Sequence, residues 1–328
     1  MTLALPEVSA GLRQRLTDGL SRVEALIEER IDHEDPFIAE ANVHLLRAGG
    51  KRFRPMLTIL AAELGDGIND SVITAAAAVE LTHLASLYHD DVMDEAELRR
   101  GTPTANTAYG NSTAILIGDL LFGHASALVA ELGSEAVRIQ AETFIRLCTG
   151  QIRDDRQAPE GEDAGAYYLR VLEDKTGVLI ATAARYGAMF AGCADDVVET
   201  MRVYGERLGM AFQLADDLID IESSAEKLGK MPGTDLREGK RTLAVLHALA
   251  STSPADARLH ELLRSDLSGD AELGEALALP RADPALEQAR AETRVVGEAA
   301  QEALTGLPDS EAKTALLALA TSVTHRAS

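Results

Sequence analysis

The sequence predicts an all-α protein, and two observations support this prediction. Prolines are absent from residues 104–158 and 160–231, which leaves room for long, uninterrupted helices. Stretches such as 112–132 and 195–224 place apolar residues three and four positions apart, which is the helical period. We find no sustained strand-like alternation of Val, Ile and Thr. Because no low-complexity linker divides the chain, we expect one domain over residues 1–328.

The same periodicity, with the capping residues and the Gly and Pro positions, defines the expected elements. Asp70 and Ser71 are expected to cap a helix over 72–97, which is Ala-rich and apolar most of the way round and is therefore expected to be central. The other expected helices are 8–32, 37–47, 53–65, 112–132, 134–156, 163–190, 195–224, 240–250, 255–265, 283–304 and 309–325. The expected loops are 50–55, 99–106, 229–240 and 266–282.

The composition excludes several classes of protein. A net charge of −22 argues against binding to nucleic acid or to a membrane surface, because both need clustered Lys and Arg. Cys148 and Cys193 have no metal-binding spacing, so we expect reduced thiols and a cytoplasmic protein. The first residues lack the pattern of a signal peptide, and no uncharged apolar run is long enough to predict a transmembrane segment.

An acidic motif occurs twice. "HDDVMD" at 89–94 and "ADDLID" at 215–220 each place three aspartates at the end of an otherwise apolar helical segment. On a helix the first and third aspartates share one face, where like charges repel. A solvated face is the plain alternative for either triplet alone, but the repetition favours a metal site. The six aspartates are Asp90, Asp91, Asp94, Asp216, Asp217 and Asp220.

Carboxylate oxygens in this arrangement suit Mg²⁺, which prefers oxygen ligands and commonly takes substrate phosphates as well. An EF-hand calcium loop needs alternating ligands, a central Gly and a final Glu, and neither stretch has them. A di-iron bundle needs two Glu-x-x-His motifs, whereas we find only Glu80–His83.

Cationic residues suited to phosphate occur in or near the expected loops. The loop "AGGKRFRP" at 48–55 combines glycines with Lys51 and Arg54, but it lacks the spacing of a Walker loop. Further cationic positions are Arg99, Arg100, Lys175, Lys230, Lys240 and Arg241. A solvated surface residue is the alternative for each of them. Taken alone, the residues indicate a helical protein that binds Mg²⁺ and one or more diphosphates.

The ordered set of motifs resembles the trans-isoprenyl diphosphate synthases, the polyprenyl synthetase family. The motifs are "GGKRFRP", "THLASLYHDDVMDEAELRRG", "GQIRDD", "DKTGVL", "AFQLADDLID" and "GKMPGTDLREGK". The resemblance covers residues from about 37 to 250. It implies a helical bundle of the isoprenoid synthase type with a central cavity, and a homodimer.

The resemblance also implies the reaction, in which isopentenyl diphosphate condenses head to tail with an allylic diphosphate. Two or three Mg²⁺ ions would be held by the two triplets, with Asp220 acting through water. The residues implied for isopentenyl diphosphate are Lys51, Arg54, His83 and Arg100. Those implied for the allylic diphosphate are Arg99, Lys175, Thr176, Gln213, Lys230 and Lys240, with Phe212 near the hydrocarbon.

Some of these assignments have plain structural alternatives. His83 lies seven residues before Asp90 on the same helical face, which favours contact with a ligand over a hydrogen-bonded core histidine. Gln213 adjoins the second triplet and is interpreted in the same way. Asp154 and Asp155 are interpreted as supporting groups rather than ligands.

Three other functions are weighed against condensation. A terpene cyclase needs one diphosphate site, whereas the 48–55 loop and Arg100 provide a second. A non-catalytic subunit of a heteromeric synthase is expected to lack one triplet or the basic loop, and this chain keeps them all. A plain metal-binding bundle would bind Mg²⁺ without diphosphate.

Product length is expected to depend on the helix that carries the first triplet. Ser86 and Ala85 lie four and five residues before Asp90, with Thr82 deeper, and all three are small. In the family a bulky aromatic residue there closes the pocket. The expected product is therefore a long chain, C30–C50, as for a quinone side chain. Geranylgeranyl or farnesyl diphosphate is the alternative.

Overall fold

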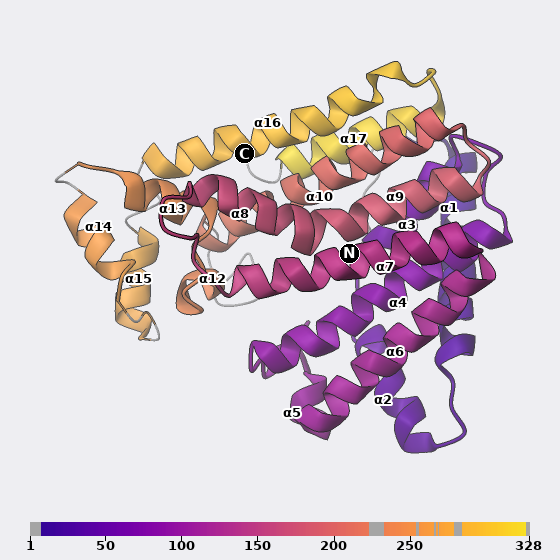
Figure 1. Ribbon diagram of the computed structural model, residues 1–328, viewed down its shortest axis with the longest axis horizontal. Helices are drawn as coiled ribbons and strands as arrows, with labels where there is room; N and C mark the ends of the chain where they lie inside the picture. The colour runs from indigo at the N-terminus through magenta and orange to yellow at the C-terminus, as the bar shows by residue number, and fades with distance from the viewer. Residues whose placement is uncertain are drawn as a thin grey trace. The chain divides into compact units, whose positions relative to one another are not determined.

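The computed structural model describes residues 8–222, 233–253, 256–265, 267, 269–278 and 284–325, and it is built almost entirely of helices (Figure 1). The prediction of an all-α fold is therefore confirmed. The chain forms two compact units, one from residues 1–144, 179–205 and 306–318 and one from 145–178, 206–305 and 319–328. The single domain expected over 1–328 stays a prediction.

The first unit holds the N-terminal helices and a short β-ribbon. Its elements are α1 (Ala10–Ile31), α2 (Pro36–Arg47), α3 (Phe53–Ala62), α4 (Asp70–Met93), β1 (Leu98–Arg99), β2 (Thr102–Pro103), α5 (Ala105–Tyr109), α6 (Asn111–Glu131) and nearly all of α9 (Val178–Phe190). The first residue of α9, Val178, belongs to the second unit, and three further helices contribute residues to both units: α7 (Ser134–Asp154), α10 (Asp195–Glu222) and α17 (Glu311–His325).

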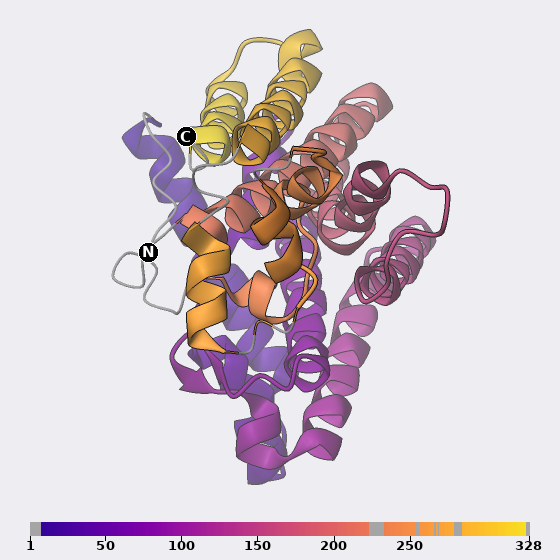
Figure 2. The same ribbon diagram turned by 90° about the vertical axis from the view of Figure 1, so that its left-hand side faces the viewer.

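The second unit holds the remaining elements. These are α8 (Ala164–Leu172), η1 (Glu173–Gly177), α12 (Thr234–Arg237), α13 (Leu243–Ala250), α14 (Ala257–Leu262), α15 (Asp270–Ala278), α16 (Pro284–Ala303) and the 3₁₀ turn η4 (Leu304–Gly306). Within this unit α13 packs against α16 and α8, and α14 and α15 lie side by side (Figure 2).

Helix α4 is the centre of the first unit, as its all-round apolar surface predicts. It packs against α1, α3 and α6, and most of its residues from Val72 to Tyr88 are buried. The side chain of Asn69 caps the helix by accepting a hydrogen bond from the backbone N–H of Val72 at 2.9 Å. The expectation that Asp70 and Ser71 form this cap was therefore wrong. At its other end, α4 delivers the first aspartate triplet at the edge of the apolar core.

The helix boundaries follow the predicted ones to within a few residues, but several connections contain structure that the pattern did not predict. The expected loops contain or overlap short elements: β1, β2 and α5 overlap 99–106, α12 lies within 229–240, and α15 lies within 266–282. The expected helix 163–190 is interrupted by η1, a π-helical turn in which the N–H of Val178 bonds to the carbonyl of Glu173. These short elements contain polar residues and span few turns, so the periodicity of apolar residues alone does not predict them.

Two helices, α4 and α6, are long and apolar enough to cross a membrane by length and composition alone. In α4 the apolar window is 78% buried within the protein, which is the property of a core helix, whereas in α6 it is 39% buried. The apolar side chains that α6 leaves exposed include Ile115 and Leu116.

Candidate active site

The first triplet is joined to a tight hairpin. Helix α4 ends at Met93, and β1 pairs antiparallel with β2 across a two-residue turn formed by Arg100 and Gly101. Both turn residues have positive φ, 56° and 77°, as a type I′ turn requires. A positive φ at a non-glycine residue such as Arg100 is strained and often marks a functional position. The hairpin places Arg99 beside the end of α4.

Asp91 is buried and incompletely paired. Its Oδ1 accepts a hydrogen bond from Arg99 Nε at 2.5 Å, while its buried Oδ2 has no hydrogen-bond partner among the described residues. Burial raises the pKa of Asp91, against the opposing effect of Arg99. Asp90 is half-buried and Asp94 is exposed. The first triplet thus combines one buried carboxylate with two that are more accessible.

The basic loop before α3 is organised by Arg52, which has a left-handed backbone at φ 46°. Its Nε donates to Glu24 at 2.9 Å, its Nη1 to buried Glu80 at 3.3 Å, and its Nη2 to the carbonyl of Leu46 at 2.9 Å. Arg52 is therefore committed to holding the loop. This arrangement presents Lys51 as an exposed side chain, in agreement with its predicted binding role.

Arg54 and His83 lie together in this cationic part of the first unit. Burial lowers the pKa of Arg54 to about 10, opposed by Glu80, and its buried Nε has no hydrogen-bond partner among the described residues. Burial and then Arg54 and Arg100 lower the pKa of His83 well below its ordinary value, so the ring is neutral at pH 7. A Cβ added to Gly50 would lie 2.8 Å from Arg100 Nη1, which shows that the hairpin packs closely against the loop. The residues predicted to bind isopentenyl diphosphate therefore gather in one region.

In the second triplet, Asp217 is buried with both carboxylate oxygens hydrogen-bonded. Gln213 Nε2 donates to Oδ1 at 3.0 Å, and the hydroxyl of Tyr168 in α8 donates to Oδ2. Burial, and then the nearby carboxylate of Asp235, raise the pKa of Asp217 to about 8. Asp220 accepts a hydrogen bond from the backbone N–H of Asp235 at 3.1 Å, which fixes the start of α12.

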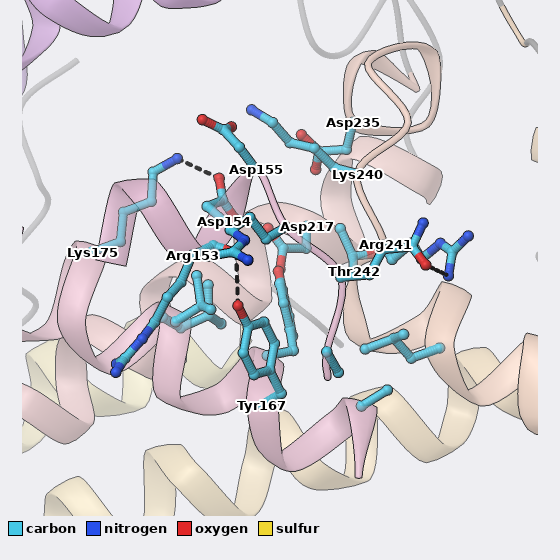
Figure 3. Close-up of a pocket in the computed structure, with 18 of the residues that line it drawn as sticks. Arg153, Asp154, Asp155, Tyr167, Lys175, Asp217, Asp235, Lys240, Arg241 and Thr242 are labelled. Atoms are coloured by element: carbon cyan, nitrogen blue, oxygen red, sulfur yellow. Dashed lines mark hydrogen bonds and ion pairs between the residues drawn. The ribbon is translucent and has the colours of Figure 1, made fainter. Parts of the chain in front are cut away.

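A cavity of about 490 Å³ opens beside the second triplet, entirely within the second unit (Figure 3). Five of the predicted site residues line it: Lys175, Thr176, Gln213, Asp217 and Lys240. Lys175 Nζ contacts Asp154 Oδ2 at 2.6 Å, and the hydroxyl of Thr176 donates to Gln213 Oε1 at 3.4 Å. Asp154 thus holds the side chain of Lys175, a residue predicted to bind substrate, and this is consistent with the interpretation of Asp154 as a supporting group.

The remaining predicted residues are placed as follows. Phe212 and Asp216 are half-buried on α10, and Lys230 lies outside the described residues. Tyr168 and Asp235 were not predicted, although both act on Asp217. Tyr168 carries no sequence signal, because it is one aromatic residue in an ordinary helix. Asp235 lies within the "GKMPGTDLREGK" motif, and an acidic residue in this motif was the one sequence feature that could have identified it as a site residue.

Each triplet, taken by itself, has the character of an incomplete metal site. The unpartnered buried oxygen of Asp91 and the raised pKa of Asp217 both show that an ionised carboxylate is costly there, and a bound cation would stabilise that ionised form. Among the described residues, however, no three His, Cys, Asp or Glu side chains form a cluster ready to hold a metal. This fits Mg²⁺, which is usually bound through one or two carboxylates together with water and substrate phosphates.

An all-helical fold with two acidic triplets, each near cationic side chains, defines a class of proteins suited to metal-complexed diphosphates. The Polyprenyl synthetase family model matches residues 35–279. The chain is 48% identical over 302 residues to nonaprenyl diphosphate synthase from Mycobacterium tuberculosis, covering 92% of this chain and 90% of that protein. The chain belongs to the polyprenyl synthetase family.

Solved structures of related proteins have the same fold. Geranylgeranyl pyrophosphate synthase from Corynebacterium glutamicum, solved with calcium and isoprenyl diphosphate, matches with a TM-score of 0.88 and 42% identity, covering 98% of this chain and 99% of that one. A decaprenyl diphosphate synthase from Rhodobacter capsulatus also matches with a TM-score of 0.88, at 36% identity, covering 97% and 98%. The predicted isoprenoid synthase fold is thus confirmed.

The environment of Asp217 predicts a specific effect of pH on stability. A carboxyl whose pKa is raised in the folded state binds more protons when folded, so its contribution becomes unfavourable as pH rises from about 4 to about 8. Metal-free Asp217→Asn should therefore gain stability over the parent protein, by at least about 1 kcal/mol more at pH 8 than at pH 5. Urea unfolding at both pH values measures this. Asp155→Asn, at an exposed carboxyl of the same cavity, is the control, and parallel pH curves for parent and Asp217→Asn would contradict the assignment.

Proposed function

We propose that the protein condenses isopentenyl diphosphate with an allylic diphosphate to give a long-chain trans-polyprenyl diphosphate. The observation that carries this proposal is the presence of two separate cationic groups, each associated with an acidic triplet. Lys51, Arg54 and Arg100, with His83 beside them, form one group in the first unit, and Lys175 and Lys240 belong to the other in the second unit. A reaction between two diphosphates needs two such groups.

In this proposal the cationic side chains bind and orient the two diphosphates. Lys51 and Arg54 hold isopentenyl diphosphate, and His83 donates a hydrogen bond to it from a ring N–H. Lys175, Thr176 and Gln213 hold the allylic diphosphate, together with Arg99 and Lys240. Phe212 presents an aromatic face to the allylic hydrocarbon, where positive charge develops as the C–O bond breaks. The alkene then attacks the allylic carbon, and the proton lost passes to the departing diphosphate.

The aspartates Asp90, Asp91, Asp94, Asp216 and Asp217 would hold two or three Mg²⁺ ions, with Asp220 acting through water. When bound, Mg²⁺ supplies positive charge that neutralises the diphosphate leaving group. Asp220 already accepts a backbone hydrogen bond from Asp235, which suits a role more distant from the metal. The C. glutamicum relative was solved with calcium, which supports the use of a divalent cation.

A terpene cyclase and a non-catalytic partner subunit are less well supported. A cyclase needs one diphosphate, which leaves the group of Arg54, His83 and Arg100 without a purpose. A non-catalytic subunit is expected to have lost part of the site, whereas both triplets and the basic loop are intact.

The first test is synthesis. Incubation with labelled isopentenyl diphosphate and C5, C10, C15 or C20 primers, followed by sizing of the products, should give polyprenyl diphosphates only when Mg²⁺ is present.

Asp90→Ala should lower kcat by at least about 100-fold, as for the loss of a strong electrostatic stabiliser. Asp155→Asn serves as the control for a lost carboxylate outside the proposed ligand set. Turnover of pure Asp90→Ala close to that of the parent enzyme would contradict the metal assignment.

We propose a product of C30–C50, for which the relatives named nonaprenyl and decaprenyl diphosphate synthase provide support. Ser86 and Thr82 lie four and eight residues before Asp90, so they form one row along α4 below the triplet. Ala85 lies beside this row and is buried. Thr82 accepts a hydrogen bond from buried Gln140 at 2.7 Å, which adds a polar group at that depth. The geranylgeranyl synthase named above keeps C20 as the alternative.

Blocking this row should shorten the product. Ser86→Phe and Ala85→Phe are each expected to stop synthesis at about C15–C20, because an added ring overfills the space the tail needs. Product sizing by chromatography measures the change. Ser322→Phe is a matched control, since Ser322 is also half-buried and, like Ser86, donates to a backbone carbonyl three residues earlier at 2.8 Å. A parent enzyme that stops at C15 or C20 with every primer would contradict the long-chain proposal.

We also propose a cytoplasmic homodimer. Cys148 and Cys193 are both free thiols, which suits a reducing compartment. The first turns of α6 expose the apolar side chains of Ile115 and Leu116, which are 43% and 65% exposed. Further along α6, the ring of Phe122 stacks on that of Phe144 of α7, with the ring centroids 3.8 Å apart. An apolar face of this kind commonly marks an interface between subunits.

Charge on this face should separate the subunits. Leu116→Glu is expected to convert the dimer to a monomer, because the carboxylate would be buried without a partner. Light scattering after size-exclusion chromatography measures the mass. Val295→Glu, at a 63% exposed apolar position on α16, should leave the dimer intact. A parent protein that is monomeric at micromolar concentration would refute this proposal.

A further inference from the structure

The π-helical turn η1 carries two of the proposed allylic diphosphate ligands, Lys175 and Thr176. In a π-helix the backbone bonds span five residues rather than four, which widens the turn and changes the direction of the side chains that follow. Such turns are intrinsically unfavourable and persist only where the surroundings hold them. The contacts that hold η1 therefore decide where Lys175 and Thr176 point.

Arg146 in α7 is the main contact. Its Nε donates to Asp174 at 2.7 Å, its Nη2 to Glu173 at 2.9 Å, and its Nη1 to Glu206 of α10 at 3.1 Å. The side chain is 34% exposed, while Asp174 and Glu206 are only 15% and 10% exposed. One guanidinium thus ties two residues of η1 to α10. Arg153 Nη1 donates to the second oxygen of Asp174 at 2.9 Å, so this carboxylate is held from two sides.

The backbone of α7 also touches η1 directly. A Cβ on Gly150 would lie 2.5 Å from the backbone nitrogen of Lys175 and 2.8 Å from the carbonyl carbon of Asp174. Gly150, Arg153 and Asp154 lie four, seven and eight residues after Arg146, so the four residues form one face of α7. This face ends at Asp154, whose Oδ2 contacts Lys175 Nζ at 2.6 Å. The same face of α7 therefore supports both the backbone and the side chain of Lys175.

We propose that Arg146 is a positioning residue for the allylic diphosphate: it fixes η1 in its π-helical form and so sets the direction of Lys175 and Thr176. This inference rests on the proposed function, which assigns those two residues to that substrate. Arg146 itself lies outside the residues that line the cavity. Its effect is indirect, through the geometry of η1, and Gly150 is the second part of the same device because it permits the close approach of α7.

A purely structural role makes a different prediction from a positioning role. An arginine that only stabilises the fold would lower the fraction of active enzyme when it is replaced. This would reduce the apparent kcat and leave both KM values unchanged. A positioning residue for one diphosphate raises KM for that substrate and leaves KM for the other unchanged, because uniform binding of one substrate is lost. The ratio of the two KM values separates the roles.

The experiment compares Arg146→Met, Arg146→Lys and Gly150→Ala in the full-length protein. KM for a C15 allylic diphosphate, KM for isopentenyl diphosphate, kcat and Tm are measured for each. Arg146→Met and Gly150→Ala should raise KM for the allylic diphosphate about tenfold or more, with KM for isopentenyl diphosphate within about twofold of the parent. Arg146→Lys should give an intermediate value, since a lysine keeps the charge but cannot reach three carboxylates.

Arg138→Met is the matched control. Arg138 lies eight residues earlier on α7 and also pairs with carboxylates, but these are Glu135 and Glu142 of its own helix. This variant should leave both KM values unchanged. If Arg146→Met does not fold, Gly150→Ala carries the test, because it disturbs η1 without removing a charge.

Lys175→Ala separates the two levels of the proposal. If Lys175→Ala leaves KM for the allylic diphosphate unchanged, the substrate assignment of η1 fails and this inference fails with it. If Lys175→Ala raises that KM while folded Arg146→Met and Gly150→Ala do not, the proposed function stands and the inference is overturned. Equal rises in both KM values for Arg146→Met and Gly150→Ala would also overturn it.

Discussion

The burial of carboxylates in an apolar helical interior is the constraint on which the rest of the structure depends. Asp91 in one unit and Asp217 in the other are each held below the surface, where a charge without a partner is costly. Arg99 satisfies one oxygen of Asp91, and Tyr168 and Gln213 satisfy Asp217 only with neutral donors. The ionised form of each carboxyl is therefore costly in the metal-free protein, and a cation brought in by a diphosphate would stabilise it.

The two units share a second device, in which a committed arginine organises a distorted stretch of backbone. Arg52 adopts a left-handed conformation and is tied to Glu24 and Glu80, which shapes the loop that presents Lys51. Arg146 is tied to three carboxylates beside the π-helical turn that presents Lys175. The planar guanidinium can donate several hydrogen bonds in fixed directions, which suits it to holding two or three groups at once. Because the hydrogen bonds of Arg52 and Arg146 are used within the protein, these two arginines are not proposed as ligands.

The sequence predicted the helices and the acidic triplets because both depend on local spacing. Helical periodicity placed α4 at the centre, and the triplets fell at its end and at the end of α10. What was missed depends on contacts between distant residues. The π-helical turn needs Arg146 and Gly150 from another helix, and Asp235 approaches Asp217 only through the fold of a connecting segment. The hairpin was missed because its turn uses Arg100 at a position where Gly or Asn is usual.

The central claim is that the buried carboxylates bind Mg²⁺ together with a diphosphate rather than as a complete site of their own. Isothermal titration calorimetry of Mg²⁺ into the protein, with and without a non-hydrolysable allylic diphosphate analogue, tests it most directly. The account predicts that the analogue increases the apparent affinity for Mg²⁺ by at least about tenfold, because substrate oxygens complete the coordination. Equal Mg²⁺ affinity with and without the analogue would contradict it.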